Sequence, residues 1–78
     1  MSKLQKMLEE IRPEFDFTQS TNFIEDGYLD SFDIISLVSM LDKEHHISIK
    51  GTDITPENFS SLESIRDVLR KYGANDET

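Results

Sequence analysis

The chain contains no cysteine, no tryptophan and few basic residues. Without cysteine it has no disulfide framework, no thiolate metal cluster and no thiol nucleophile of its own, which fits a reducing compartment. Eight Lys and Arg residues face sixteen Asp and Glu, for a formal net charge of −8. Such a chain repels nucleic acid and favours basic partners. It also lacks the apolar run of a signal peptide or membrane span, so we expect a cytoplasmic protein.

The length of 78 residues predicts a single domain over residues 1–78. A domain of this size buries only about 60% of the surface that its unfolded chain exposes. The core is therefore thin, and a deep, walled active site does not fit. We expect a protein without catalytic activity of its own.

Apolar residues at helical spacing predict three long helices. The first runs from an N-cap at Ser2 to Ile11 and is ended by Pro13. The second covers residues 31–44 and is capped by Asp30. Between them we expect a long loop that lies on the core through its aromatic rings.

The third long helix is expected to open at a capping box formed by Ser60 and Glu63 and to stop at Gly73, followed by a flexible tail over residues 74–78. A short helix is expected at residues 55–59 and an extended loop with two buried isoleucines at residues 47–49. The predicted fold is all-α, a small four-helix bundle of three long helices and one short helix.

The chain contains several residue types that carry chemistry in other proteins. His45 and His46 are adjacent and cannot share one helical face, which argues against a metal site. The carboxylates of residues 25–33 do not match an EF-hand loop, although they are compatible with weak divalent binding. A small hydrolase that uses Ser31 with one of the histidines is disfavoured, because a thin bundle offers no oxyanion pocket.

Negative charge is concentrated on the segment of residues 25–44, which has six acids and one base and so carries −5 of the net −8. The second predicted helix lies in this segment and has more apolar residues than one core-facing stripe needs, with Phe32 and Ile35 left near its exposed face. An apolar patch rimmed by charge is typical of a protein-docking surface. The sequence therefore predicts recognition by basic partner proteins.

Ser31 stands at the head of that helix, between Asp30 and Phe32. A hydroxyl at this place is either a capping group or a modification site, since helix N-terminal N–H groups and the helix dipole favour a phosphodiester there.

Two sequence blocks resemble the acyl and peptidyl carrier proteins. Residues 27–33, Gly-Tyr-Leu-Asp-Ser-Phe-Asp, are similar to the phosphopantetheine attachment motif of that family. Residues 53–65 are similar to the family's third helix and the start of its fourth, at the expected distance. The resemblance covers roughly residues 20 to 72.

The resemblance implies that Ser31 receives 4'-phosphopantetheine from a phosphopantetheinyl transferase, the holo-acyl-carrier-protein synthase, and that Asp30 positions this complex. The arm would carry acyl or aminoacyl intermediates as thioesters in fatty acid, polyketide or related biosynthesis. A monomer is expected, whose partners are ligases and synthases with basic docking faces. The residues implied to face partners are Phe32, Asp33, Ile35, Ser36, Asp42 and Lys43.

Departures from the family pattern leave the cargo open. Tyr28 stands where fatty-acid carriers have glycine, and the Gly-x-Leu-Asp-Ser-Phe form resembles stand-alone carriers, including D-alanyl carriers. A D-alanyl or peptidyl carrier protein is therefore an alternative. A protein-interaction module that keeps the fold without modification is another.

Overall fold

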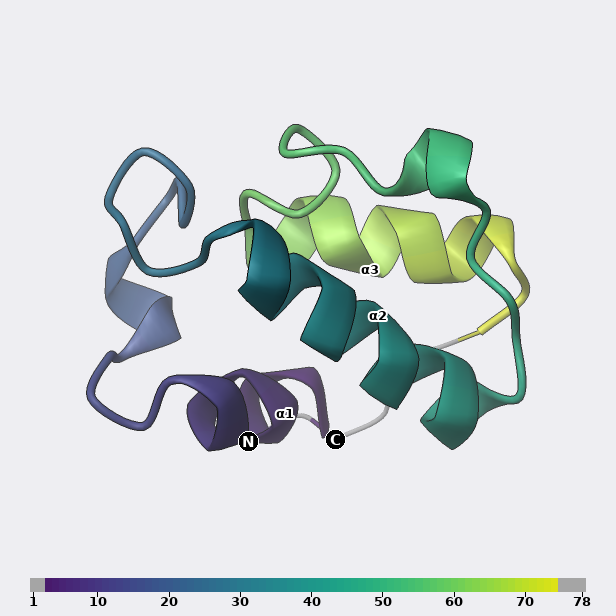
Figure 1. Ribbon diagram of the computed structural model, residues 1–78, viewed down its shortest axis with the longest axis horizontal. Coiled ribbons are helices and arrows are strands. Elements are labelled where there is room, and N and C mark those ends of the chain that lie inside the picture. The colour runs from purple at the N-terminus through teal and green to yellow at the C-terminus, as the bar shows by residue number, and fades with distance from the viewer. Residues whose placement is uncertain (1–2, 75–78) are drawn as a thin grey trace.

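The computed structural model describes residues 3–74, which form three α-helices and no strand. The helices are α1 (Lys3–Ile11), α2 (Ser31–His45) and α3 (Leu62–Lys71). α1 packs along α2, and α2 lies between α1 and α3 in the view of Figure 1. Two long connections join the helices, and each contains one short 3-10 helix, at Phe17–Gln19 and at Gly51–Asp53. None of the described helices has both the length and the apolar character needed to cross a bilayer.

The all-α prediction is confirmed, but the expected short fourth helix at residues 55–59 is a hydrogen-bonded turn. The Phe59 N–H donates to the carbonyls of Thr55 and Pro56, both at 3.2 Å, and the pattern goes no further. The Ser60 carbonyl instead accepts a hydrogen bond of 2.6 Å from the Phe23 N–H in the first long connection. A single turn has too few hydrogen bonds to offset the cost of helix nucleation, so it does not grow into a helix.

The predicted start of α3 is wrong by one residue. Ser61 is the N-cap, and its hydroxyl and that of Ser64 accept reciprocally from each other's backbone N–H at 3.1 Å. Ser60, the predicted cap, donates instead to the Glu57 carbonyl at 3.0 Å. The proposed Ser2 cap of α1 lies outside the described residues.

The end of α3 follows the prediction at Gly73, which has a φ of 77°. Ala74, expected to begin a flexible tail, is buried, and its N–H donates to the Leu69 carbonyl at 2.8 Å. Residues 75–78 of that predicted tail lie outside the described part of the chain.

The apolar stripes of the three helices and the rings of the connections meet in one core. Its largest fully buried side chains are Phe23, Phe59, Leu4, Leu8, Leu37, Leu41, Ile65 and Leu69. The molecule measures 28 × 26 × 18 Å. Because a helix with its side chains is about 10 Å across, the shortest dimension accommodates two helical layers.

The first long connection lies on this core through aromatic rings, as predicted. Phe17 and Phe23 are buried with their rings edge to face at 5.0 Å between centroids. Tyr28 stacks on Phe15 at 4.4 Å. These contacts hold the chain that leads into the head of α2.

The second connection begins at His46, which ends α2 with a φ of 56°. This left-handed conformation costs a residue with a Cβ roughly 1 kcal/mol, whereas glycine adopts it freely. We expect His46→Gly to raise the free energy of unfolding by about 1 kcal/mol in urea titrations. His46→Ala is the control, because alanine keeps the conformational cost; equal stability of the two variants would contradict this prediction.

The 3-10 helix at Gly51–Asp53 is tied to the end of α3 through the Asp53 carboxylate. The Tyr72 hydroxyl donates to Asp53 Oδ2, and Lys71 Nζ lies 2.9 Å from Asp53 Oδ1. These two hydrogen bonds, the one from Tyr72 foremost, lower the pKa of Asp53 below its ordinary value. The contact therefore stabilises the fold above the unfolded-state pKa of about 3.9, and this stabilisation is lost as the pH falls through the lower folded-state pKa.

Tyr72→Phe removes the leading cause of that shift. We expect it to lower the urea midpoint at pH 7 and to lower it less in acid, where Asp53 is protonated in both proteins. Tyr28→Phe is the matched control, since the Tyr28 hydroxyl has no hydrogen-bond partner among the described residues. If Tyr72→Phe lowers the urea midpoint as much in acid as at pH 7, the hydrogen bond to Asp53 does not make stability depend on pH in this way.

Candidate functional site

Ser31 is the first residue of α2 and its side chain is exposed. Its hydroxyl has no hydrogen-bond partner within the part of the chain that the structure describes. The N-cap is the preceding residue, Asp30, so the capping interpretation of Ser31 is wrong. The serine hydroxyl is left exposed at the edge of the fold.

Asp30 and Asp33 form a reciprocal capping box around that serine. Asp30 Oδ1 accepts from the Asp33 N–H at 2.9 Å, and Asp33 Oδ2 accepts from the Asp30 N–H at 3.1 Å. The backbone N–H of Asp33 is the main cause that lowers the pKa of Asp30, with a smaller contribution from the charge of Arg12. Both carboxylates also complement the positive end of the helix dipole.

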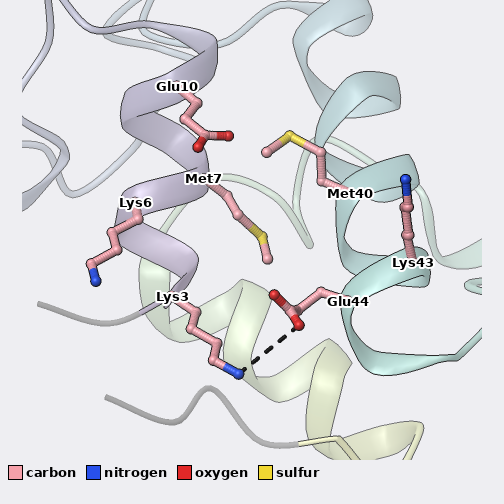
Figure 2. A pocket seen from close by; sticks show the side chains of 7 residues that line it. All are labelled: Lys3, Lys6, Met7, Glu10, Met40, Lys43 and Glu44. Atoms are coloured by element: carbon pink, nitrogen blue, oxygen red, sulfur yellow. Dashed lines mark ion pairs between the residues drawn. The ribbon is translucent and has the colours of Figure 1, made fainter.

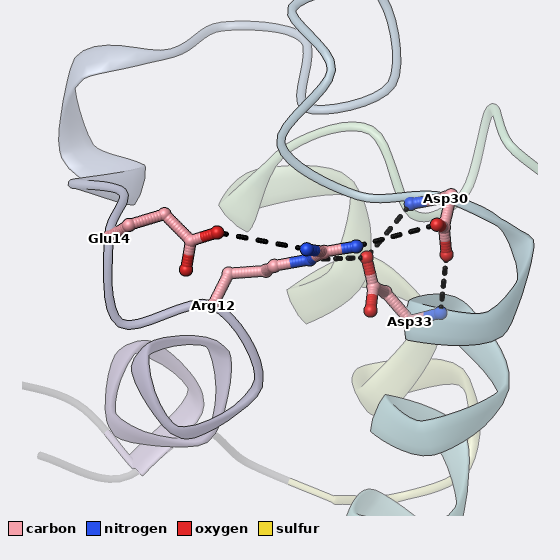
Figure 3. A network of polar contacts seen from close by, with 4 residues as sticks. All are labelled: Arg12, Glu14, Asp30 and Asp33. Atoms are coloured by element: carbon pink, nitrogen blue, oxygen red, sulfur yellow. Dashed lines mark hydrogen bonds and ion pairs between the residues drawn. The ribbon is translucent and has the colours of Figure 1, made fainter.

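Arg12, one residue beyond α1, joins this capping box to the first helix (Figure 3). Its Nε lies 2.8 Å from Asp33 Oδ2, its Nη2 3.4 Å from Asp30 Oδ2 and its Nη1 3.7 Å from Glu14 Oε2. The hydrogen bond to Asp33 is the main reason that the pKa of Arg12 is raised. Sequence reasoning did not find Arg12, since no motif or periodicity links it to residues 18 and 21 positions later.

The exposed face of α2 continues from Ser31 toward the end of the helix. Phe32 is 82% exposed and Ile35 is 59% exposed, and Ser36 and Lys43 are also exposed. Ile35 and Ser36 follow Phe32 by three and four residues, and Lys43 follows Ser36 by seven, which places them along one side of the helix. Two large apolar side chains in water beside a free serine form a surface suited to protein contacts.

Asp33 and Asp42, the acids implied to face partners, are engaged within the chain. Asp33 is only 9% exposed and contacts Arg12, and Asp42 is half-buried with Oδ1 accepting from the Ile49 N–H at 3.0 Å. The helical period of α2 places both carboxylates on sides of the helix that face other parts of the chain. The surface beside Ser31 is therefore more apolar, and less acidic, than charge counting along the sequence predicted.

The arrangement does not support a serine hydrolase. His45 ends the helix that Ser31 begins, and the 14 residue steps between them span about 21 Å at 1.5 Å per residue. Nor do the described residues contain a group of three or more His, Asp or Glu side chains that could hold a metal ion. The carboxylates considered for divalent binding are instead used in part by the capping box and by Ser20, whose hydroxyl donates to Asp26 at 2.6 Å.

A groove of about 520 Å³ lies between α1 and the far half of α2 (Figure 2). It has a methionine floor and a charged rim, and Lys3 pairs with Glu44 across it at 3.9 Å. The lining residues are Lys3, Lys6, Met7, Glu10, Met40, Lys43 and Glu44. None of these is a serine, a histidine or an aspartate, so the groove holds no triad that would make it an active site.

The described fold and site define a small helical domain that presents one free serine at a helix N-terminus. The chain is 38% identical over 55 residues to an acyl carrier protein of Buchnera aphidicola subsp. Baizongia pistaciae (strain Bp), across 70% of this chain and 68% of that protein. The chain belongs to the acyl carrier protein family, a family of carriers and not of catalysts. No protein-family model and no solved structure matches it.

Proposed function

We propose that this protein carries acyl or aminoacyl groups as thioesters on a 4'-phosphopantetheine arm attached to Ser31. The observation that carries the proposal is the exposed Ser31 hydroxyl, which has no partner among the described residues and follows Asp30 at the head of α2. Membership of the acyl carrier protein family supports it.

The residues around Ser31 fit such an arm. The serine oxygen would be bonded to the phosphate at the first turn of a 15-residue helix, where free N–H groups and the helix dipole favour a negative charge. Arg12 offsets part of the repulsion from the two nearby aspartates. The arm supplies the thiol that this cysteine-free chain lacks.

The surface beside Ser31 is proposed to receive the partner enzymes in turn. Phe32 and Ile35 provide apolar anchors, while Ser36 and Lys43 extend the same face along α2. The exposed carboxylate of Asp30 would pair with a basic residue of a phosphopantetheinyl transferase. Asp33 and Asp42 support this surface from within.

The test is incubation of the purified protein with a promiscuous phosphopantetheinyl transferase and coenzyme A. We expect the intact mass to rise by one phosphopantetheine arm. No rise with several transferases would contradict the carrier proposal and favour an unmodified interaction module. Weighing the thioester trapped on the native protein then identifies the cargo and separates fatty acyl, polyketide, aminoacyl and D-alanyl carriers.

A further inference from the structure

Arg12 makes the single direct connection drawn in Figure 3 between the end of α1 and the turn that contains Ser31. Its guanidinium is about one-third exposed and reaches both carboxylates of the capping box. It directly follows α1, so its contacts depend on how α1 packs against α2. Arg12 thus adds a polar link between the head of α2 and the end of α1 to the packing of the two helices.

The carboxylates of Asp33 and Asp30 differ in how much they need the positive charge of Arg12. The Asp33 side chain is 12% exposed, and its Oδ2 accepts both Arg12 Nε and the Asp30 backbone N–H. A carboxylate this shielded is costly without a charged partner. The Asp30 side chain is 58% exposed and can be solvated without Arg12.

The distances from the Arg12 guanidinium also differ between Asp33 and Asp30. Arg12 Nε lies 2.8 Å from Asp33, the length of a strong charge-assisted hydrogen bond, whereas Nη2 lies 3.4 Å from Asp30. The guanidinium therefore holds Asp33 firmly and Asp30 loosely. Asp30 Oδ2 stays open on its solvent side to a cation from another protein.

We propose that Arg12 is a positioning residue for the modification of Ser31. By holding Asp33 from the end of α1, it fixes the first turn of α2 and the serine within it, while it leaves Asp30 accessible to the transferase. The inference rests on the proposed carrier function and adds a residue outside the attachment motif. The opposite role, in which Arg12 competes with the transferase for Asp30, predicts that removing it speeds modification.

The test compares Arg12→Gln, Arg12→Lys and Glu14→Gln as substrates of one transferase with coenzyme A in excess. Because the carrier is the transferase's protein substrate, partial unfolding raises the apparent KM, but it leaves kcat at saturating carrier unchanged. A misplaced serine lowers kcat itself. We expect Arg12→Gln to lower kcat about tenfold, since small displacements of a reacting group have effects of this order or larger.

Arg12→Lys should recover part of kcat, because lysine keeps the charge but not the two-pronged geometry. Glu14→Gln is the matched control; it removes a 3.7 Å ion pair with Arg12 away from the helix head and should behave as wild type. Amide hydrogen exchange gives a readout independent of the transferase. In Arg12→Gln we expect faster exchange at Asp33 and Ile34, whose N–H groups bond to Asp30, with no change in α3.

An unchanged or raised kcat for Arg12→Gln would overturn the inference, and so would unchanged exchange at the head of α2. Either result leaves the carrier proposal standing, provided that the wild-type protein takes up the arm in the same assay. A wild-type protein that takes up no arm would instead overturn the proposed function.

Discussion

Ser31→Ala is expected to abolish attachment of the phosphopantetheine arm, with no modified protein detectable by intact mass under conditions that convert the wild type completely. The substitution removes the only atom of this side chain that can form the phosphodiester. No other residue replaces it, because the neighbours Asp30 and Phe32 carry no hydroxyl. The expected effect is all or none.

The fold should be unaffected by this change. The Ser31 hydroxyl is exposed and has no hydrogen-bond partner within the described residues, and alanine is a good helix former. Thermal unfolding of Ser31→Ala should therefore match that of the wild type. Ser39→Ala, at another exposed serine of α2, is the control and should be modified normally. An arm found on Ser31→Ala would exclude Ser31 as the attachment site.

Phe23→Ala is expected to have the largest effect on stability, about 3 to 5 kcal/mol, as for other buried aromatic residues. Phe23 is fully buried and packs edge to face on Phe17. Its backbone joins the two long connections, since its N–H donates to Ser60, and its carbonyl accepts from Tyr28 at 2.8 Å and Leu29 at 3.1 Å. Total stabilities of about 5 to 15 kcal/mol are usual, so this loss leaves a largely unfolded or marginal protein.

Urea unfolding followed by circular dichroism measures this loss. Phe23→Leu is the matched control, because it keeps most of the apolar volume and should cost less than half as much. Phe32→Ala, at an aromatic residue that is 82% exposed, should leave the midpoint nearly unchanged. A small effect of Phe23→Ala would mean that the first connection does not support the core as its packing indicates.

Where the signals are local, the sequence predicts this fold well. The stripe of α2 separates buried Ile34 and Leu37 from exposed Phe32 and Ile35 as its spacing requires. The sequence also predicts the Asp30 cap, because a carboxylate before a helix can accept from free backbone N–H groups. Both signals involve only residues within one or two turns of each other.

The errors of prediction have tertiary causes. Two adjacent serines, Ser60 and Ser61, are both able to cap α3, and the hydrogen bond from Phe23 to the Ser60 carbonyl places the helix start at the second. Local propensity does not distinguish these choices, because each alternative has an equivalent local hydrogen bond.

The sequence by itself determined the helical class, the position of α2 and the serine at its head, because helical period and capping depend on neighbouring residues. Only the tertiary structure decided that Asp33 turns inward and that Arg12, directly after α1, meets it, while Phe32 and Ile35 stay exposed beside Ser31. A charge count along the chain treats every carboxylate as solvated. The packing of α1 on α2 pairs Asp33 with a cation 21 residues away, and so takes it out of the surface that partners can reach.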